Sequence, residues 1–144
     1  MDRMQMSRVE IKEKFLRDHR RLRAKAAVVT TLALSVLRGD EDLASALRLK
    51  GEEMYAYLLE HMEWEETQLI PLLAESSIGE TIGSAILERH EAHRQRLSDS
   101  LADLRKPGAS FVKLARDCVA LVRRLEDDMA SEEREVFKSI DIGA

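Results

Sequence analysis

The sequence predicts an all-α protein folded as an up-down-up-down bundle of four long helices. Apolar residues recur at spacings of three and four along four long segments, as on one face of a helix. No stretch of useful length alternates between apolar and polar residues as a half-buried strand does. Only 6 Gly and 2 Pro interrupt the 144 residues, and the main breaks fall between the periodic segments. Short connections of this kind join antiparallel neighbours in helix bundles.

The composition predicts one domain, residues 1–144, which is long enough to bury roughly 70% of its unfolded surface. Its 23 basic and 27 acidic residues give a net charge of −4, and no basic run indicates nucleic-acid binding. The single cysteine, Cys118, excludes a disulfide framework and a cysteine-based zinc site. Because no apolar run is long enough to span a bilayer and the N-terminal residues lack a secretory core, we expect no membrane partner and a cytoplasmic location.

The start and end of the first helix carry specific signals. Ser7 and Glu10 have the spacing of a capping box. Gly39 provides a stop, and Asp40 is a suitable cap for the following helix. The first helix is therefore expected between Ser7 and Gly39.

Three further helices are expected at 41–75, 77–106 and 109–139. Pro71 lies inside the second and predicts a local kink, because proline removes a backbone donor and clashes with the preceding turn. Ser77 and Glu80 form a second candidate capping box. Pro107 and Gly108 separate the third helix from the fourth.

The second helix carries the stretch His61-Met-Glu-Trp-Glu65-Glu66, followed by Leu-Ile-Pro71. His61 and Glu65 are four residues apart, so both leave the same helix face. Leu58, Leu69 and Leu72 are expected to extend that face. The imidazole of His61 and the carboxylate of Glu65 therefore lie within an apolar stripe. Burying a charged carboxylate there costs several kcal/mol unless an opposite charge meets it, and a metal ion is one such partner.

The same spacing returns in the fourth helix, where Asp128 corresponds to His61 and Glu132 to Glu65. His19 and His90 lie on the inner faces of the first and third helices. Each helical hairpin therefore offers one histidine on its first helix and a ligand pair on its second. Two such hairpins related by a rough two-fold axis would direct both sets toward one place in the core.

Each histidine taken alone is consistent with an ordinary core residue whose hydrogen bonds are satisfied. Three histidines and three carboxylates at matching depth are expensive to bury without a common partner. Imidazole and carboxylate suit iron, manganese or zinc. Because carboxylates can bridge neighbouring ions, the duplicated set predicts two metal ions.

The residues from His19 to Phe137 resemble the hemerythrin-like family, also called HHE cation-binding domains. The resemblance implies a four-helix bundle holding two iron ions, bridged by carboxylate and by an oxo or hydroxo group, with zinc or manganese as alternatives. The residues that it implies as ligands are His19, His61, Glu65, His90, Asp128 and Glu132.

The sequence departs from this family at two positions. Asp128 stands where the family has a histidine, and Arg94 stands where oxygen-carrying members have a second histidine of the third helix. His93, one residue before Arg94, is either a ligand itself or a residue that lies behind the ligands or at the surface. Glu66 and Glu133 are expected at the surface or behind the ligands, and Tyr57 is expected to hydrogen-bond a ligand or to pack in the core.

Such an oxygen-rich donor set favours an oxidised metal and argues against reversible O₂ transport. The leading hypothesis is therefore an iron protein acting in oxygen or redox response, iron sensing or storage, with O₂ or peroxide as a small-molecule partner. A di-iron oxidase, peroxidase or stress-repair protein is the alternative from the enzyme class. A metal-free helical interaction module with a decayed site is the third hypothesis. The sequence identifies no catalytic residue outside the ligand set and no protein partner.

Overall fold

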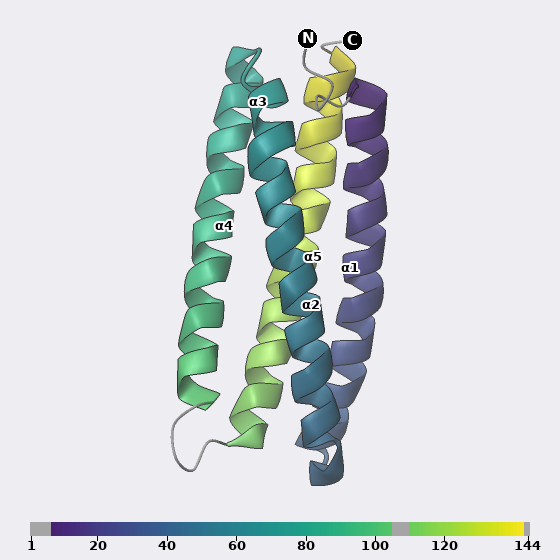
Figure 1. The fold of residues 1–144 in the computed structure, drawn as a ribbon, viewed down its shortest axis with the longest axis vertical. Helices are drawn as coiled ribbons and strands as arrows, with labels where there is room; N and C mark the ends of the chain where they lie inside the picture. Colours follow the sequence, from purple (N-terminus) through teal and green to yellow (C-terminus); the bar gives the residue numbers. More distant parts are fainter. Residues whose placement is uncertain (1–6, 105–109, 143–144) are drawn as a thin grey trace.

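The computed structural model describes residues 7–104 and 110–142. It confirms the all-α prediction, since helices dominate these residues and no strand occurs among them. Four long helical segments form the bundle in Figure 1. They are α1 (Arg8–Leu37), α2 (Ala44–Trp64) with its continuation through η2 (Glu65–Leu69) and α3 (Ile70–Leu73), α4 (Ser77–Leu104) and α5 (Phe111–Ile142), with the short turn η1 (Glu41–Leu43) before α2.

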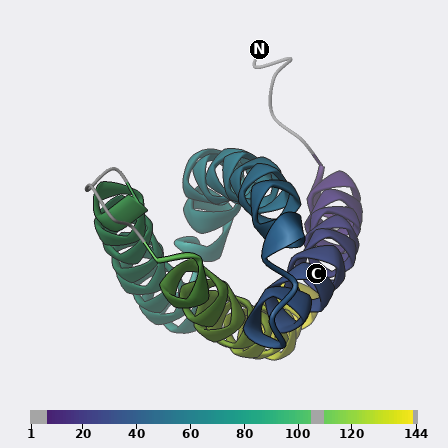
Figure 2. The ribbon, with the colours of Figure 1, turned by 90° about the horizontal axis from the view of Figure 1, so that it is seen from below.

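The segments alternate in direction along the long axis, as predicted (Figure 1). Helix α5 packs against α1 and α4, while α1 also packs against α2 and α3 packs against α4. In the end-on view, α1 and α4 lie at opposite sides of the bundle with α5 between them (Figure 2). None of the helices in the described part of the chain has the length and apolar character needed to cross a bilayer.

The helix ends follow the sequence signals in part. The Ser7–Glu10 capping box is present, and Gly39 adopts a positive φ of 111°, which glycine tolerates best. Asp40 occupies the N-cap position of η1, as predicted, but its side chain makes no capping hydrogen bond.

The predicted cap at Ser77 is wrong, because Ser76 fills the role one residue earlier. The Ser76 Oγ accepts a hydrogen bond from the Gly79 N–H at 3.0 Å. A Cβ at Gly79 would lie 2.0 Å from the Leu73 carbonyl oxygen. The close approach of α4 to the preceding helix therefore requires glycine and fixes the start of α4.

The boundaries expected at residues 106 and 109, together with the intervening Pro107–Gly108 break, lie outside the described residues. At the other end of the fourth helix, α5 continues to Ile142, three residues beyond the expected end at 139.

The buried faces depart from the predicted stripes at two places. On α3, Leu73 is buried where Leu72 was expected. On α5 the central positions belong to Val122 and Met129, so Leu121 and Asp128 lie at the edge of the buried face. The second shift places Asp128 at the margin of the core.

Candidate metal centre

A wide helical turn positions the first candidate carboxylate. At η2 the Ile70 N–H donates to the Glu65 carbonyl, five residues back, so the helix is π-helical there. Because Pro71 lacks an N–H and its ring crowds the carbonyl four residues earlier, it favours a wider turn in place of a regular one. This turn lies beside Pro71, where a local kink was predicted, and both Glu65 and Leu69 are buried in it. π-Turns within α-helices often occur at functional sites.

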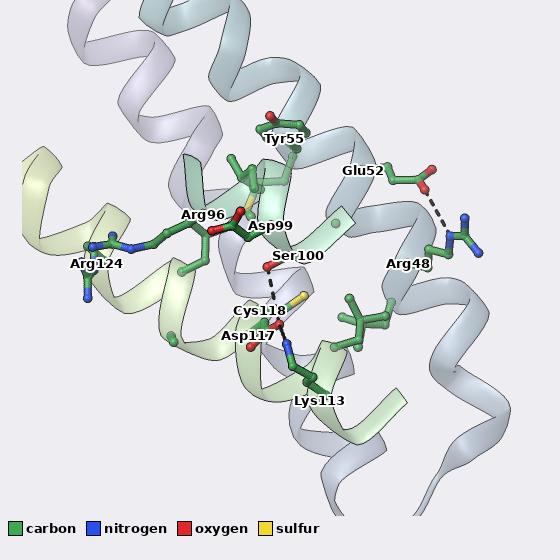
Figure 3. Close-up of a pocket in the computed structure, with 17 residues that line it drawn as sticks. Arg48, Glu52, Tyr55, Arg96, Asp99, Ser100, Lys113, Asp117, Cys118 and Arg124 are labelled. Atoms are coloured by element: carbon green, nitrogen blue, oxygen red, sulfur yellow. Dashed lines mark hydrogen bonds and ion pairs between the residues drawn. The ribbon is translucent and has the colours of Figure 1, made fainter. Parts of the chain in front are cut away.

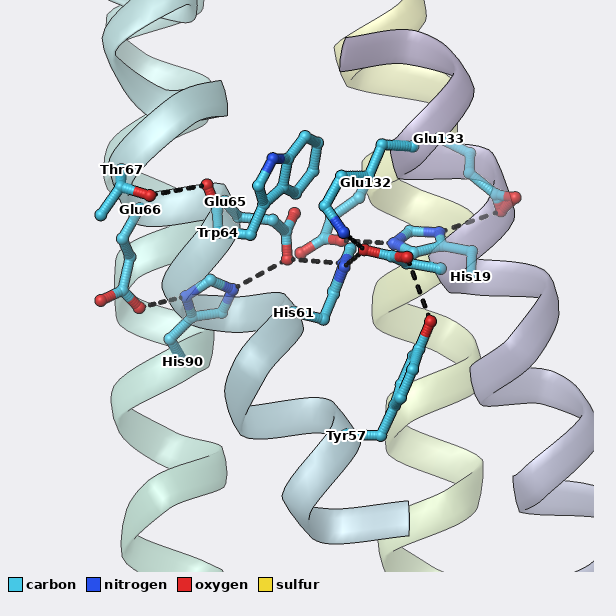
Figure 4. A network of polar contacts seen from close by, with 12 residues as sticks. His19, Tyr57, His61, Trp64, Glu65, Glu66, Thr67, His90, Glu132 and Glu133 are labelled. Carbon is cyan, nitrogen blue, oxygen red and sulfur yellow. Dashed lines mark hydrogen bonds and ion pairs between the residues drawn. The ribbon is translucent and has the colours of Figure 1, made fainter. Parts of the chain in front are cut away.

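Four of the six predicted ligands form one cluster in the bundle interior. His19, His61, Glu65 and Glu132 each offer a donor atom, and these four atoms lie within 4.8 Å of one another. The Glu65 Oε1 lies 3.0 Å from the His61 Nε2, and the Glu132 Oε2 lies 3.4 Å from the His19 Nε2. All four side chains are buried. Figure 4 shows them converging from three helices.

His90 joins the cluster through Glu65. Its Nε2 lies 3.3 Å from the same Glu65 Oε1 that faces His61. One carboxylate oxygen of η2 thus faces imidazoles of both α2 and α4 (Figure 4). Glu65 therefore links His90 to the cluster formed by His19, His61 and Glu132.

The outer nitrogen of His61 is bound by a buried carboxylate that sequence reasoning missed. Asp18 is only 3% exposed, and its Oδ2 lies 3.0 Å from the His61 Nδ1. The Lys14 ammonium and the Tyr57 hydroxyl donate to the same carboxylate, at 2.9 and 3.1 Å. Burial would raise the pKa of Asp18, but the hydrogen bonds from His61 and Lys14 outweigh it and hold the pKa well below its usual range.

His19 has a similar partner on its outer side. Its Nδ1 lies 3.6 Å from the Glu133 Oε2, which also forms an ion pair with Arg23. Burial raises the pKa of Glu133, and the Arg23 hydrogen bond more than reverses that effect. Glu133 was expected at the surface or behind the ligands, and it lies behind His19.

His90 completes the pattern. Its Nδ1 lies 2.6 Å from the Glu66 Oε2, and Arg94 donates to the same oxygen at 2.7 Å. For His61 and His90 a cation holds a carboxylate, the carboxylate lies within hydrogen-bond distance of Nδ1, and Nε2 is directed inward. The Glu133 carboxylate lies near the His19 Nδ1 without a hydrogen bond to it. A charged carboxylate at Nδ1 keeps the proton there and leaves the Nε2 lone pair for a metal, as seen around metal-bound histidines.

The charges of the cluster depend on one another. Burial would lower the pKa of His61, but the Glu65 charge and the Asp18 hydrogen bond raise it to about 9. Burial would raise the pKa of Glu65, and His61 and His90 lower it instead. Burial and the neighbouring Glu65 charge raise the pKa of Glu132. Without a metal, therefore, a proton on His61 balances part of the carboxylate charge.

Asp128 and His93 pair with each other beside the cluster. The Asp128 Oδ2 lies 2.8 Å from the His93 Nε2, and the Asp128 side chain is 24% exposed. The His93 Nδ1 is buried and makes no hydrogen bond to a described residue. Asp128 thus faces the site from its edge, and the sequence repeat that aligned it with His61 did not reveal this pairing. One small cavity of about 10 Å³ is lined by Asp128 and His93 together with the other predicted ligands, which are His19, His61, Glu65, His90 and Glu132.

The clustered histidines and carboxylates are suited to a metal ion, because several of their buried polar atoms make no hydrogen bond. Both ring nitrogens of His19, the Nε2 of His61 and the Oε2 of Glu65 are buried without a hydrogen bond to the described residues. Buried polar atoms are rarely left so. Two donors bound to one ion at about 2.2 Å lie at most about 4.4 Å apart, so the cluster needs only slight contraction around an ion.

The family model of the hemerythrin HHE cation-binding domain matches residues 11–140. The chain belongs to this family. Its buried His/Glu cluster is a site able to hold a metal ion, in keeping with the cation-binding description. No curated protein and no solved structure gives a significant match to this hemerythrin-type chain.

Asp18 is the residue at this hemerythrin-type site that sequence reasoning did not find. A weak signal existed, since Lys14 precedes Asp18 by one helical turn and forms an i, i+4 pair with it. Asp18 lies one position from His19 and outside the apolar stripe, so the periodic pattern did not mark it as an inner residue. The neighbouring helix α2 buries it instead, through His61 and Tyr57.

Proposed function

We propose that this hemerythrin-type domain binds two iron ions and acts in oxygen or redox response, or in iron sensing or storage. The proposed ligands are His19, His61, Glu65, His90, Asp128 and Glu132. The position of Glu65 between His61 and His90 carries the proposal, because one carboxylate oxygen faces histidines of two different helices. The four clustered donors support one ion, and we assign His90 and Asp128, which line the same cavity, to a neighbouring one.

The donor types support iron in an oxidised state. Imidazole and carboxylate donors suit iron, manganese and zinc, and carboxylate oxygens favour the higher oxidation state. A bound iron pair would supply one-electron chemistry toward O₂ or peroxide. The chain's own residues Asp18 and Glu66 favour one tautomer of His61 and of His90. Such a site suits a response to an oxidant, or retention of iron, better than reversible O₂ transport.

The small cavity supports a role with small molecules only. Its volume of about 10 Å³ is near the minimum for one water molecule. Its apolar wall comprises Leu22, Leu58, Met62, Leu125 and Met129. An organic substrate does not fit beside the ligands in this arrangement, which disfavours an oxidase of large substrates. The unsatisfied buried nitrogens of His19 and His61 disfavour the metal-free module.

Elemental analysis of the full chain, purified without chelators, tests the proposal together with its near-ultraviolet and visible spectrum. We expect about two irons per chain and absorption from a bridged iron pair. One ion per chain would contradict the paired site, and zinc or manganese in place of iron would contradict the metal assignment. A colourless protein free of metal would contradict the function. Turnover of peroxide well above that of free iron would favour the peroxidase alternative.

A further inference from the structure

A second and larger cavity, about 360 Å³, lies between α2, α4 and α5 (Figure 3). We call it the α2–α4–α5 pocket. Its apolar lining residues are Leu47, Met54, Leu97, Leu114, Cys118 and Leu121. It shares no lining residue with the metal cavity. Leu97 packs in one apolar cluster with Leu58, Leu125 and Met129, which line the metal cavity, so this cluster separates the two spaces.

Gly51, in the first half of α2, lines the pocket and leaves space in its wall. Its φ is not positive, so the backbone does not require glycine there. A Cβ built at Gly51 meets only the Cys118 Sγ, at 3.9 Å, which is an ordinary contact. Glycine inside a helix costs roughly 0.5–1 kcal/mol relative to alanine. Because neither the backbone nor a neighbouring atom requires glycine at position 51, the consequence of Gly51 that we can identify is the space it leaves in the pocket wall.

The charges around the pocket are unbalanced. Its lining includes four cationic and three acidic side chains. Among the described residues Glu52 forms an ion pair with Arg48 and Asp117 with Lys113, while Asp99 accepts a hydrogen bond from the neutral Gln95 amide. The Arg96 Nη1 is buried without a hydrogen bond.

Arg124, also at the pocket, forms no ion pair with a described residue. Figure 3 shows the Arg96 and Arg124 side chains at the left of the view, toward one end of the pocket. That end therefore has guanidinium groups available for an anion.

We propose that the α2–α4–α5 pocket binds an aliphatic carboxylate of medium chain length. Its chain would lie along the leucine and methionine floor, where burial of apolar surface stabilises it. Its carboxylate would meet Arg96 and Arg124, since a guanidinium matches a carboxylate with two parallel hydrogen bonds. The volume of 360 Å³ lies within the range of small-molecule sites. This site is independent of the proposed iron centre.

Titration calorimetry of the metal-loaded full chain with decanoate tests the proposal. We expect saturable binding of one decanoate per chain, with decanol and propionate each at least about tenfold weaker, because each lacks one of the two interactions. Arg96→Gln should weaken decanoate binding about tenfold or more, while Arg48→Gln, which alters a rim arginine already paired with Glu52, should change it little. Gly51→Leu should fill the pocket and abolish binding, and Gly51→Ala should not.

The sole cysteine supplies a site-specific readout. Burial raises the pKa of the Cys118 thiol to about 11, so alkylation at alkaline pH proceeds slowly and decanoate should slow it further. Absence of saturable decanoate binding would overturn the proposal. Wild-type affinity for decanoate in Arg96→Gln would also overturn it, and this test remains valid even if Gly51→Leu fails to fold. A dimer in light scattering that Gly51→Leu converts to a monomer would show that a second copy covers the pocket, which also overturns it.

Discussion

The two halves of the metal site carry the same residue spacing but lie in different surroundings. In the half built by α1 and α2, His19, His61 and Glu65 are at most 3% exposed. In the half built by α4 and α5, His90 and Glu132 are similarly buried, but the Asp128 side chain is 24% exposed and pairs with His93. His61 is held by Asp18 on its outer side, whereas Asp128 is held by a second histidine.

This difference shows that the rotation of a helix about its axis determines how deeply a candidate ligand is buried. The spacing of Asp128 and Glu132 equals that of His61 and Glu65, yet the centre of the buried face on α5 passes through Met129. A residue one position away from that centre reaches the site only from its edge. Sequence repeats therefore identify candidate ligands, while packing against neighbouring helices sets how deeply each one lies.

The largest contrast should come from removing one ligand from each half. His61→Ala should lose most bound metal, whereas Asp128→Ala should retain at least half. The melting temperature of His61→Ala should fall because metal stabilises the folded state, by roughly 4 kcal/mol at a thousandfold excess over Kd. Elemental analysis and thermal melts with and without chelator measure both. Unchanged metal content in His61→Ala would remove His61 from the ligand set.

The pH dependence of the metal-free protein should differ in sign between the halves. His61 has a pKa of about 9, above its value of 6.5 in the unfolded chain, so its contribution is present below pH 6.5 and is lost as pH rises toward 9. The shift corresponds to roughly 3 kcal/mol at most. Burial lowers the pKa of His93, despite the attraction of Asp128, so its contribution is present above pH 6.5 and is lost as pH falls.

Thermal melts across pH in the presence of chelator test this expectation. The fall in melting temperature between pH 6.5 and 9 should be reduced in His61→Gln and kept in His93→Gln. A melting temperature that rises over this interval in the parent chain would contradict the assignment of charge to His61. Metal affinity should increase over the same interval, because binding at His61 releases its proton.

The outer carboxylates allow a finer comparison within the site. Asp18→Asn should weaken metal binding about 10–100-fold, as loss of such partners commonly does. Glu133→Gln should have a smaller effect, because Glu133 lies 3.6 Å from His19 and is more exposed. Competition with a chelator measures both affinities, and Asp42→Asn on the exposed η1 turn is the matched control. Equal affinities in Asp18→Asn and the control would show that Asp18 only packs.

The smallest expected change in metal content concerns Asp128→His. If Asp128 is a ligand, the variant should retain metal and shift the visible spectrum toward a more nitrogen-rich site. The substitution also replaces the carboxylate that pairs with His93 by an imidazole. The ion pair between residues 93 and 128 should therefore be lost. Outright loss of metal would mean that the two halves do not correspond at this position.

The sequence predicted the helices and the polar residues of the core because both depend on local periodicity. His19, His61 and Glu65 occupy the inner positions expected from spacing alone. The π-turn at Glu65–Leu69, the cap at Ser76 and the burial of Asp18 were not predicted. Each depends on contacts with another helix or on a single extra residue in a turn, which a periodic pattern does not record.

The cations that hold the outer carboxylates lie partly in solvent. The side chains of Lys14, Arg23 and Arg94 are 28%, 39% and 34% exposed, and each is linked through a carboxylate to a buried imidazole. Dissolved salt screens exposed charges over about 8–10 Å at physiological ionic strength. A change in ionic strength, or acetylation of Lys14, would therefore reach the histidines by electrostatics alone. The partly exposed cations thus connect the buried histidines electrostatically to the surrounding solution.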